Sequence, residues 1–322
     1  MKRREFMNLI AGAVLSPLAA RAQQPKMLRV GYSGIMPREA PHYAAFEKRM
    51  AELGYQQGRN FTFEYIQAPG IEGYELTYRE LAARKVDIML AAGNEPALRA
   101  ARAAAGATPI VFIALDFDPV EKGYVASLSR PGSNSTGIFV SQLELAGKRI
   151  ELLREAFPKA RRVGLFWDAA SREQTVAAAA AAGQLGFEPR LLELTGQPPN
   201  YSAALKPMED SPGEPIMIPA SPLFLRDRAI IAPLLLERRT PSIAALREVM
   251  EAGALMSYGV NLVDLFRDVA AFVDQVARGG KAGDVPMGAP SHFHTAFNVK
   301  TAQALGLEIS PTLLARADEV IE

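Results

Sequence analysis

The feature that most constrains the fold is a regular alternation of strand-like and helix-like segments, which runs through the chain twice. The strand-like segments are short, continuous apolar runs, as expected for parallel strands that are buried on both faces of a sheet. The helix-like segments repeat apolar residues every three or four positions. Two successive runs of this kind predict an α/β protein with two doubly wound parallel-sheet domains.

The first run ends near residue 140. Its first helix places Tyr43, Phe46 and Met50 on one face, and Gly54 ends that helix. Alternating aromatic and polar residues mark the second strand. We expect strands over residues 28–33, 60–66, 86–92, 109–115 and 136–140, and helices over residues 41–53, 74–84 and 94–105.

The second run starts near residue 143. Its longest helix has Leu265, Val269 and Val273 on its apolar side, and Gly279-Gly280 ends it. An extended piece through Phe293 and Phe297 follows. We expect strands over residues 162–167, 188–194, 215–219, 242–246 and 254–258, and helices over residues 143–157, 171–185, 201–208, 223–238, 262–278, 299–305 and 311–321.

The first 22 residues have the pattern of an export signal. They begin with the basic run Lys2-Arg3-Arg4, continue with an apolar stretch over residues 6–18, and end with Ala20-Arg21-Ala22. The small residues in that last run predict cleavage before Gln23. The apolar stretch is shorter than the about 20 residues that a spanning helix needs. The arginine pair resembles the twin-arginine export motif, and both that route and the general secretory route remain open.

Composition excludes several classes of function. The chain has 36 basic and 35 acidic residues, and subtracting the four basic residues and one acidic residue of the signal leaves a net charge of −2. Because no basic stripe remains, we expect no nucleic-acid partner. No second long apolar run occurs, so we expect the processed chain to be soluble. The absence of cysteine is compatible with export without establishing it.

Ligands of open parallel sheets bind in the crevice at the carboxyl ends of the strands. We therefore interpret the residues at the predicted strand ends as ligand-binding candidates. In the first domain these are Tyr32, Ser33, Gly34, Gly93, Asn94, Asp116 and Phe117. In the second domain they are Trp167, Asp168, Ala220, Ser221 and Tyr258.

Several of these candidates have an equally simple structural interpretation. Asn94 and Ser221 open helices, where exposed amides suit an anion, but the same residues are also ordinary N-caps. Trp167 is the single tryptophan, and its ring either stacks on a ligand or packs in the core. Tyr32 and Tyr258 offer a ring and a hydroxyl to a ligand, or are hinge or core residues.

The sequence predicts no metal, no cofactor and no catalytic residue. Asp116 is the better ligand contact of the pair Asp116 and Asp118, because Asp118 precedes a proline and suits a turn. His292 and His294 lie two residues apart, so both side chains point to one face. A zinc site needs a third ligand, and His42 is the remaining histidine, so we interpret the pair as surface residues. Neither a phosphate-binding loop nor a nucleophile elbow is present.

Three groups of motifs, spread in order over the chain, resemble one family of exported solute-binding proteins. They are DPV at residues 118–120 with SLSRPGSNSTG at 127–137, LMSYG at 255–259, and NVKTA at 298–302 with ALGL at 304–307 and LARADEVIE at 314–322. The family is the substrate-binding component of ABC importers related to the tryptophan-binding proteins.

This resemblance implies a type I periplasmic-binding fold, in which two lobes close on a small molecule without chemistry. Characterised relatives bind aromatic amino acids. The sequence departs from the family pattern at Asn94-Glu95, where threonine and proline are common, and at Phe117, where glycine is usual. The run PSHFH at residues 290–294 replaces a more typical proline-threonine-lysine-phenylalanine-glutamate. The first two changes fall at strand ends, so the ligand is left open.

We expect the chain after Tyr258 to cross back to the first domain and return. The domains are then a signal peptide at residues 1–22, an N-terminal lobe at 27–140 plus about 260–290, and a C-terminal lobe at 141–259 plus about 291–322. The predicted function is a monomeric periplasmic protein that delivers an aromatic or hydrophobic amino acid or carboxylate to an ABC permease in the inner membrane, which it contacts transiently. The alternatives are an exported two-domain α/β enzyme and a ligand-sensing module for a membrane receptor.

Overall fold

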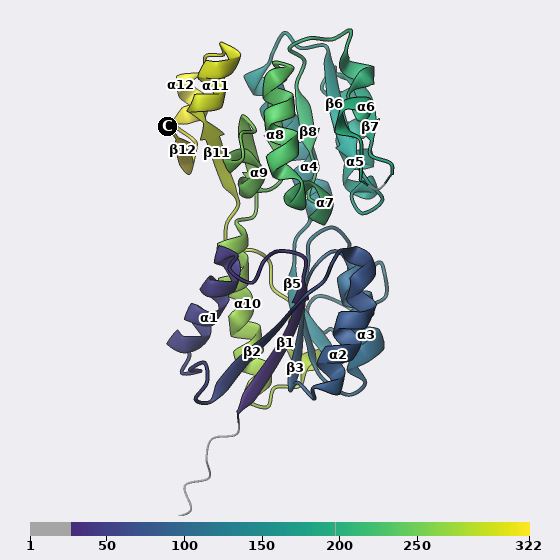
Figure 1. Ribbon diagram of the computed structural model, residues 1–322, viewed down its shortest axis with the longest axis vertical. Helices are drawn as coiled ribbons and strands as arrows, with labels where there is room; N and C mark the ends of the chain where they lie inside the picture. Colours follow the sequence, from purple (N-terminus) through teal and green to yellow (C-terminus); the bar gives the residue numbers. More distant parts are fainter. Residues whose placement is uncertain (1–26, 197) are drawn as a thin grey trace, which may run out of the picture.

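The structure, a computed structural model, describes residues 27–196 and 198–322 as two α/β lobes joined end to end (Figure 1). The predicted signal peptide at residues 1–22 lies outside the described residues. Each lobe has a central sheet with helices on both faces, which confirms the fold class that the alternation predicts. None of the helices in the described ranges is long and apolar enough to span a membrane.

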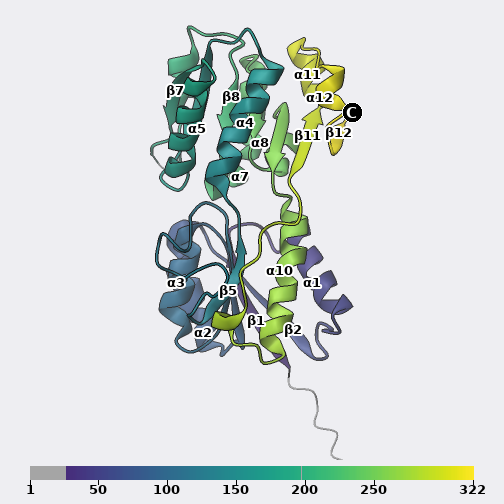
Figure 2. The same ribbon diagram turned by 180° about the vertical axis from the view of Figure 1, so that it is seen from behind.

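The N-terminal lobe contains a five-stranded parallel sheet in the order β2-β1-β3-β4-β5. Its strands are β1 (Leu28–Gly34), β2 (Phe61–Gln67), β3 (Ile88–Gly93), β4 (Ile110–Ala114) and β5 (Ser135–Phe139). Its helices are α1 (Pro41–Glu52), η1 (Ile71–Gly73), α2 (Tyr74–Ala83), α3 (Glu95–Ala105), α10 (Leu262–Ala277) and η3 (Ala282–Asp284). Helices α1 and α10 cover one face of this sheet, and α2 and α3 cover the other (Figures 1 and 2).

The C-terminal lobe contains a seven-stranded sheet in the order β12-β11-β10-β9-β8-β6-β7. Its strands are β6 (Arg162–Trp167), β7 (Glu188–Glu193), β8 (Ile216–Ile218), β9 (Ser242–Ala244), β10 (Met256–Gly259), β11 (His294–Asn298) and β12 (Glu319–Ile321). Its helices are α4 (Gln142–Ala156), α5 (Arg172–Gln184), α6 (Tyr201–Ala204), η2 (Lys206–Met208), α7 (Pro222–Arg226), α8 (Arg228–Glu237), α9 (Arg247–Glu251), α11 (Val299–Leu305) and α12 (Pro311–Leu314).

The chain passes between the lobes three times. The first passage leads from β5 to α4, the second from β10 to α10, and the third from the region of Gly288 to β11 (Figure 2). The third passage runs beside β5, because Gly288 N–H donates to the Gly137 carbonyl at 2.8 Å and Phe139 N–H donates to the Gly288 carbonyl at 2.9 Å. These passages hold the carboxyl ends of both sheets toward each other.

Two sequence-based expectations for the C-terminal lobe are wrong in detail. The helix expected over residues 311–321 is a single turn, α12, and Glu319–Ile321 forms β12 instead. The reason is a non-local pairing, since β12 lies parallel to β11, while β11 pairs antiparallel with β10. The helix expected over residues 223–238 is interrupted at Asp227, whose carboxylate accepts bonds from Arg226 Nε at 2.7 Å and the Tyr201 hydroxyl at 2.7 Å.

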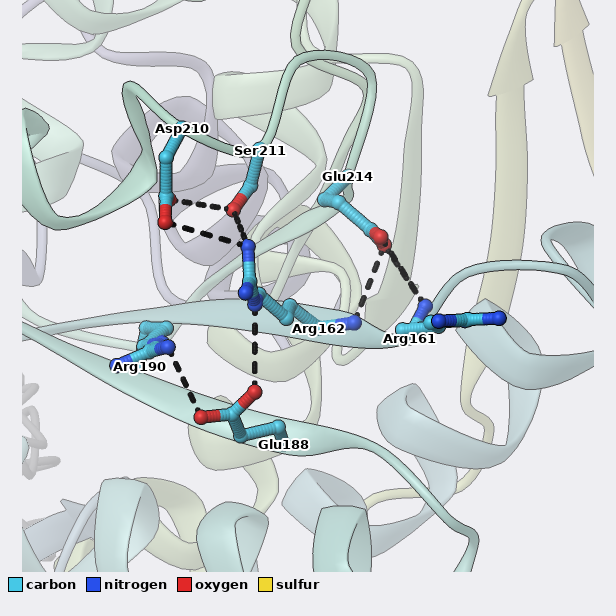
Figure 3. Close-up of polar contacts among 7 residues, drawn as sticks. All are labelled: Arg161, Arg162, Glu188, Arg190, Asp210, Ser211 and Glu214. Carbon is cyan, nitrogen blue, oxygen red and sulfur yellow. Dashed lines mark hydrogen bonds and ion pairs between the residues drawn. The ribbon is translucent and has the colours of Figure 1, made fainter.

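A polar network secures the end of the C-terminal lobe that faces away from the other lobe (Figure 3). The Glu214 carboxylate accepts the backbone N–H groups of Arg161 at 3.1 Å and Arg162 at 3.2 Å. The Arg162 guanidinium in turn donates to Glu188 at 3.2 Å and to the Ser211 hydroxyl at 2.6 Å. The loop before β8 is thereby tied to the amino ends of β6 and β7.

Gly137 in β5 supports a direct prediction about stability. Its φ angle is 150°, and a Cβ atom added there would lie 1.8 Å from the Phe112 carbonyl oxygen. We expect Gly137→Ala to lower the free energy of unfolding by more than about 2 kcal/mol, because both the backbone strain and the clash oppose the native strand. Urea denaturation followed by circular dichroism measures this change.

Gly183 in α5 is the matched control, because a Cβ atom added there meets nothing within 4 Å. Gly183→Ala should be neutral or stabilise the protein by up to about 1 kcal/mol, as expected for alanine in a helix. Equal urea midpoints for the two variants would show that the β5 environment is not as tight as described.

Candidate functional site

A cavity lies between the two lobes, at the carboxyl ends of strands from both sheets. The space between its walls is about 650 Å³ when the part open to the solvent is included, and about 70 Å³ can hold the centre of a water-sized sphere. The N-terminal lobe contributes residues from the ends of β1, β3 and β4 and from α1 and α10, and the C-terminal lobe contributes residues that follow β8 and β9. The lining residues are Tyr32, Ile35, Met36, His42, Tyr43, Tyr74, Ala92, Gly93, Asn94, Ile113, Leu115, Asp116, Ala220, Ser221, Pro222, Leu225, Leu246, Leu262, Leu265 and Phe266.

One wall of the cavity is a cluster of aromatic rings. The Tyr32 ring centroid lies 5.3 Å from that of Tyr43 and 5.7 Å from that of Phe266, both in edge-to-face arrangements. The His42 ring lies 4.7 Å from that of Phe266. This wall is suited to the face or edge of a flat, apolar ligand group.

The ionisable members of this wall are uncharged at neutral pH. Burial lowers the pKa of His42 to about 4, so its imidazole is neutral. Burial also raises the pKa of Tyr32 and of Tyr43 well above the ordinary tyrosine value, so both phenols keep their protons. The aromatic wall therefore offers a ligand rings and neutral polar groups, without a net charge.

The polar part of the cavity has buried atoms without a partner in the protein. Asn94 is 2% exposed, and neither its Oδ1 nor its Nδ2 has a hydrogen-bond partner. Asn94 stands at the N-cap position of α3, yet its side chain does not cap that helix. The Asp116 Oδ1 atom, which follows β4, is buried and unpartnered as well. Buried polar atoms of this kind are rare in folded proteins and fit a site that a polar ligand completes.

Asp116 sits in an environment that opposes its charge. Burial raises the pKa of its carboxyl well above the ordinary value; the backbone N–H of Glu95 offsets part of this rise, and the negative charge of Asp168 adds to it. A cation placed beside Asp116 would reverse this effect, because an opposite charge at contact distance favours the ionised carboxylate. The Asp116 carboxyl would therefore ionise more readily beside a positively charged group than in the empty cavity.

The wall from the C-terminal lobe is already hydrogen-bonded. Asp168 Oδ2 accepts from the Ser221 hydroxyl at 2.6 Å, and Asp168 Oδ1 accepts from the Ser171 hydroxyl at 2.6 Å. Ser221 Oγ also accepts from Leu223 N–H at 3.2 Å and so caps α7. Ala220 exchanges two bonds with the Gln174 amide, at 3.0 and 2.8 Å. This wall holds its shape through internal bonds.

The structure brings half of the predicted binding residues to this cavity. Those that line it are Tyr32, Gly93, Asn94, Asp116, Ala220 and Ser221. Those that do not line it are Ser33, Gly34, Phe117, Trp167, Asp168 and Tyr258.

The predicted residues outside the cavity have partners elsewhere. The Ser33 hydroxyl pairs with the Thr77 hydroxyl at 2.7 Å. Phe117 packs edge-to-face on Tyr124, with ring centroids 5.8 Å apart. The Gly34 carbonyl accepts the Tyr65 hydroxyl at 3.0 Å.

The other three, Trp167, Asp168 and Tyr258, lie at the carboxyl ends of β6 and β10 in the C-terminal lobe. Asp168 lines a neighbouring crevice between the lobes and bonds to Ser221. The Tyr258 carbonyl accepts Arg149 Nε at 2.7 Å. The guanidinium carbon of Arg172 lies 6.0 Å from the centre of the Trp167 ring, whose buried Nε1 has no partner.

Sequence reasoning missed the residues that α1 and α10 contribute. His42 and Tyr43 come from the start of α1, and Leu262, Leu265 and Phe266 come from the first turns of α10. The apolar stripe of α10 is visible in the sequence, but the spacing of its residues does not show which part of the stripe faces the other lobe. One sequence signal could have indicated this contribution to the cavity. The apolar stripe extends to the first turn of the helix, which directly follows the second passage between the lobes.

Comparisons with known proteins agree with this geometry. The sequence profile of the family described as ABC transporter substrate binding protein matches residues 39–321. A tyrosine-binding protein of Clostridioides difficile (strain R20291) is 22% identical over 303 residues, covering 89% of this chain and 84% of that protein.

Solved structures show the same fold. A conserved domain protein from Vibrio cholerae O1 biovar El Tor aligns with a TM-score of 0.82 at 21% identity, covering 92% of this chain and 100% of that chain. An ABC domain from Streptococcus pneumonia in complex with L-Trp aligns with a TM-score of 0.82 at 20% identity and the same coverage. The ligand-free, open structure of a substrate-binding protein with adhesive properties from Clostridium difficile aligns with a TM-score of 0.68 at 23% identity, covering 92% and 99%.

The family match spans most of the chain, and the resemblance that the sequence motifs indicated is confirmed. The cavity and the two lobes agree with the profile match on a substrate-binding protein. The chain belongs to the ABC transporter substrate-binding protein family.

Proposed function

We propose that this protein binds an aromatic amino acid between its lobes and delivers it to an ABC importer. The observation that carries this proposal is the composition of the cavity, which joins an aromatic wall to unpartnered polar atoms of Asn94 and Asp116. An aromatic amino acid has the matching groups, a flat apolar side chain and a polar end with a positive charge.

In this proposal the ammonium group of the ligand pairs with Asp116, which then ionises. The ligand carboxylate lies near the start of α3, where backbone amides and the Asn94 side chain favour an anion. The ligand side chain lies against Tyr32 and Phe266. The ends of β1, β3 and β4 thus bind the ligand, and the hydrogen-bonded wall from the C-terminal lobe covers it.

We further propose that the lobes close around the ligand by hinge motion. The three passages between lobes are the segments that would bend. The structure aligns better with the L-Trp complex, at a TM-score of 0.82, than with the ligand-free, open relative, at a TM-score of 0.68. The sequence identities to the two relatives are nearly the same. This difference supports a closed arrangement here. A ligand that contacts both lobes favours that arrangement through its extra contacts.

The remaining parts of the proposal concern location and partners. The pattern of residues 1–22 supports export to the periplasm, by either the general secretory or the twin-arginine route. Family membership supports transient docking of the closed protein on an inner-membrane permease. Transport energy then comes from ATP hydrolysed by other subunits.

Ligand class is tested by thermal unfolding of the purified protein in the presence of single amino acids. We expect L-tryptophan, L-tyrosine or L-phenylalanine to raise the melting temperature, because binding to the folded state alone adds about 2.7 kcal/mol at a concentration of 100 Kd. D-galactose is the control and should produce no shift. A flat response to every aromatic amino acid would reject the proposed ligand class.

Asp116→Asn tests the proposed ammonium contact. We expect this variant to bind the amino acid about 10- to 100-fold more weakly in calorimetric titration, because a charge-assisted contact contributes about 1.5–3 kcal/mol. Asp210→Asn removes an acidic group at the far end of the C-terminal lobe and should leave the affinity unchanged (Figure 3). Equal affinities of Asp116→Asn and the wild type would rule out the contact.

The raised pKa of Asp116 also predicts a pH dependence of stability in the empty protein. Burial keeps a proton on the folded carboxyl above the pH at which the unfolded chain releases it. The folded state therefore binds more protons, and the free energy of unfolding falls as the pH rises from about 4. Asp116→Asn lacks this titration.

The difference in unfolding free energy, wild type minus Asp116→Asn, should thus decline with rising pH until the folded carboxyl ionises. Urea titrations of both proteins at several pH values, without ligand, measure it. A difference that is constant with pH, or that increases, would show that Asp116 is not held in an apolar environment.

A further inference from the structure

A second cluster of ligating side chains lies at the passage that leads into β11, outside the amino-acid cavity. His292 and His294 lie two residues apart on this extended segment, and their ring centroids are 4.5 Å apart. Asp318 stands directly before β12, which pairs with β11 through Ala296 and Glu319. The pairing of two strands thus brings a carboxylate from the end of the chain to a pair of histidines.

The three side chains converge to within coordination range of one point. One ligating atom from each of His292, His294 and Asp318 lies within 4.8 Å of the other two. His292 Nε2 and Asp318 Oδ1 are 3.0 Å apart. In a tetrahedral zinc site with bonds of about 2.0–2.1 Å, ligand atoms are separated by about 3.3 Å. Small rotations of these half-exposed side chains reach that geometry.

Neighbouring groups already orient two of the three ligands. Thr295 N–H donates to Asp318 Oδ2 at 2.7 Å, and Asp318 N–H donates to the Thr295 carbonyl at 2.8 Å, which leaves Asp318 Oδ1 directed at the histidines. His294 Nε2 lies 2.9 Å from Asp264 Oδ2, which leaves Nδ1 of that ring for a metal. A carboxylate behind a ligating imidazole is the usual outer support of zinc sites.

We propose that His292, His294 and Asp318 form a site for a divalent transition metal, Zn²⁺, with Asp264 supporting His294 and water completing the coordination. Two imidazoles with one carboxylate suit zinc, whereas Mg²⁺ and Ca²⁺ prefer sites made of oxygen atoms. None of the four residues lines the amino-acid cavity, so the site is separate from it.

The position of this site links it to the hinge. Asp264 belongs to α10, which packs in the N-terminal lobe, while β11 and Asp318 belong to the C-terminal lobe (Figure 2). A bound metal would fasten the third passage to both lobes. The opposite side of the same turn of α10 presents Leu262, Leu265 and Phe266 to the amino-acid cavity.

The test is calorimetric titration of Zn²⁺ into untagged protein that has been stripped with a chelator. We expect one equivalent of Zn²⁺ to bind the wild type. The double variant His292→Asn with His294→Asn, and separately Asp318→Asn, should weaken this binding at least about 100-fold, and Asp264→Asn should weaken it about 10-fold. Glu308→Gln removes an exposed acidic group outside the cluster and should bind as the wild type does.

Titration with Co²⁺ supplies a second measurement, because tetrahedral coordination by imidazole and carboxylate gives visible absorption bands that the double variant should lack. Circular dichroism of each variant confirms that the fold is retained. The proposal is overturned if the wild type binds less than one equivalent of Zn²⁺, or if the double variant binds Zn²⁺ as tightly as the wild type.

Discussion

Three passages of the chain between the lobes hold the carboxyl ends of two mainly parallel sheets face to face, and the rest of the structure depends on this constraint. Strand ends in such sheets carry the loops and helix starts at which ligands bind. Here the ends of β1, β3 and β4 meet those of β8 and β9 across one cavity. The tight contact of Gly137 with β4, and the bonds of Gly288 along β5, fix the first and third passages beside each other.

The cavity combines features that favour and oppose the empty state. The aromatic wall of Tyr32, Tyr43 and Phe266 is stabilised by its own ring contacts whether or not a ligand is present. The buried and unpartnered atoms of Asn94 and Asp116 are unfavourable in the empty protein, because each loses contact with water without gaining a bond. In the proposed function, a ligand supplies the hydrogen bonds that these atoms lack. The unpartnered atoms therefore lower the stability of the empty protein, and they favour ligands that have matching polar groups.

The sequence predicted those features that depend on local pattern. The alternation of apolar runs and amphipathic helices predicted both sheets, and the strand-end rule placed Asn94 and Asp116 among the candidates that line the cavity. Features that depend on non-local pairing were not predictable in the same way. The strand β12 was mistaken for a helix because its pairing with β11 is a non-local contact that the local residue pattern does not show.

The same limitation explains the missed parts of both sites. The contribution of Phe266 depends on where the second passage places α10, and the position of Asp318 beside His292 depends on the pairing of β11 with β12. Neither fact is encoded in residue spacing. Local periodicity therefore indicates what each segment is, while the return of the chain between lobes decides which segments share a site.

The most direct test of the central claim is a crystal structure of the protein with the aromatic amino acid that stabilises it most. The account predicts that the ligand lies in the cavity between the lobes, with its ammonium nitrogen within hydrogen-bond distance of the Asp116 carboxylate and its ring against Tyr32 and Phe266. A ligand bound outside this cavity, or one whose ammonium group points away from Asp116, would contradict it.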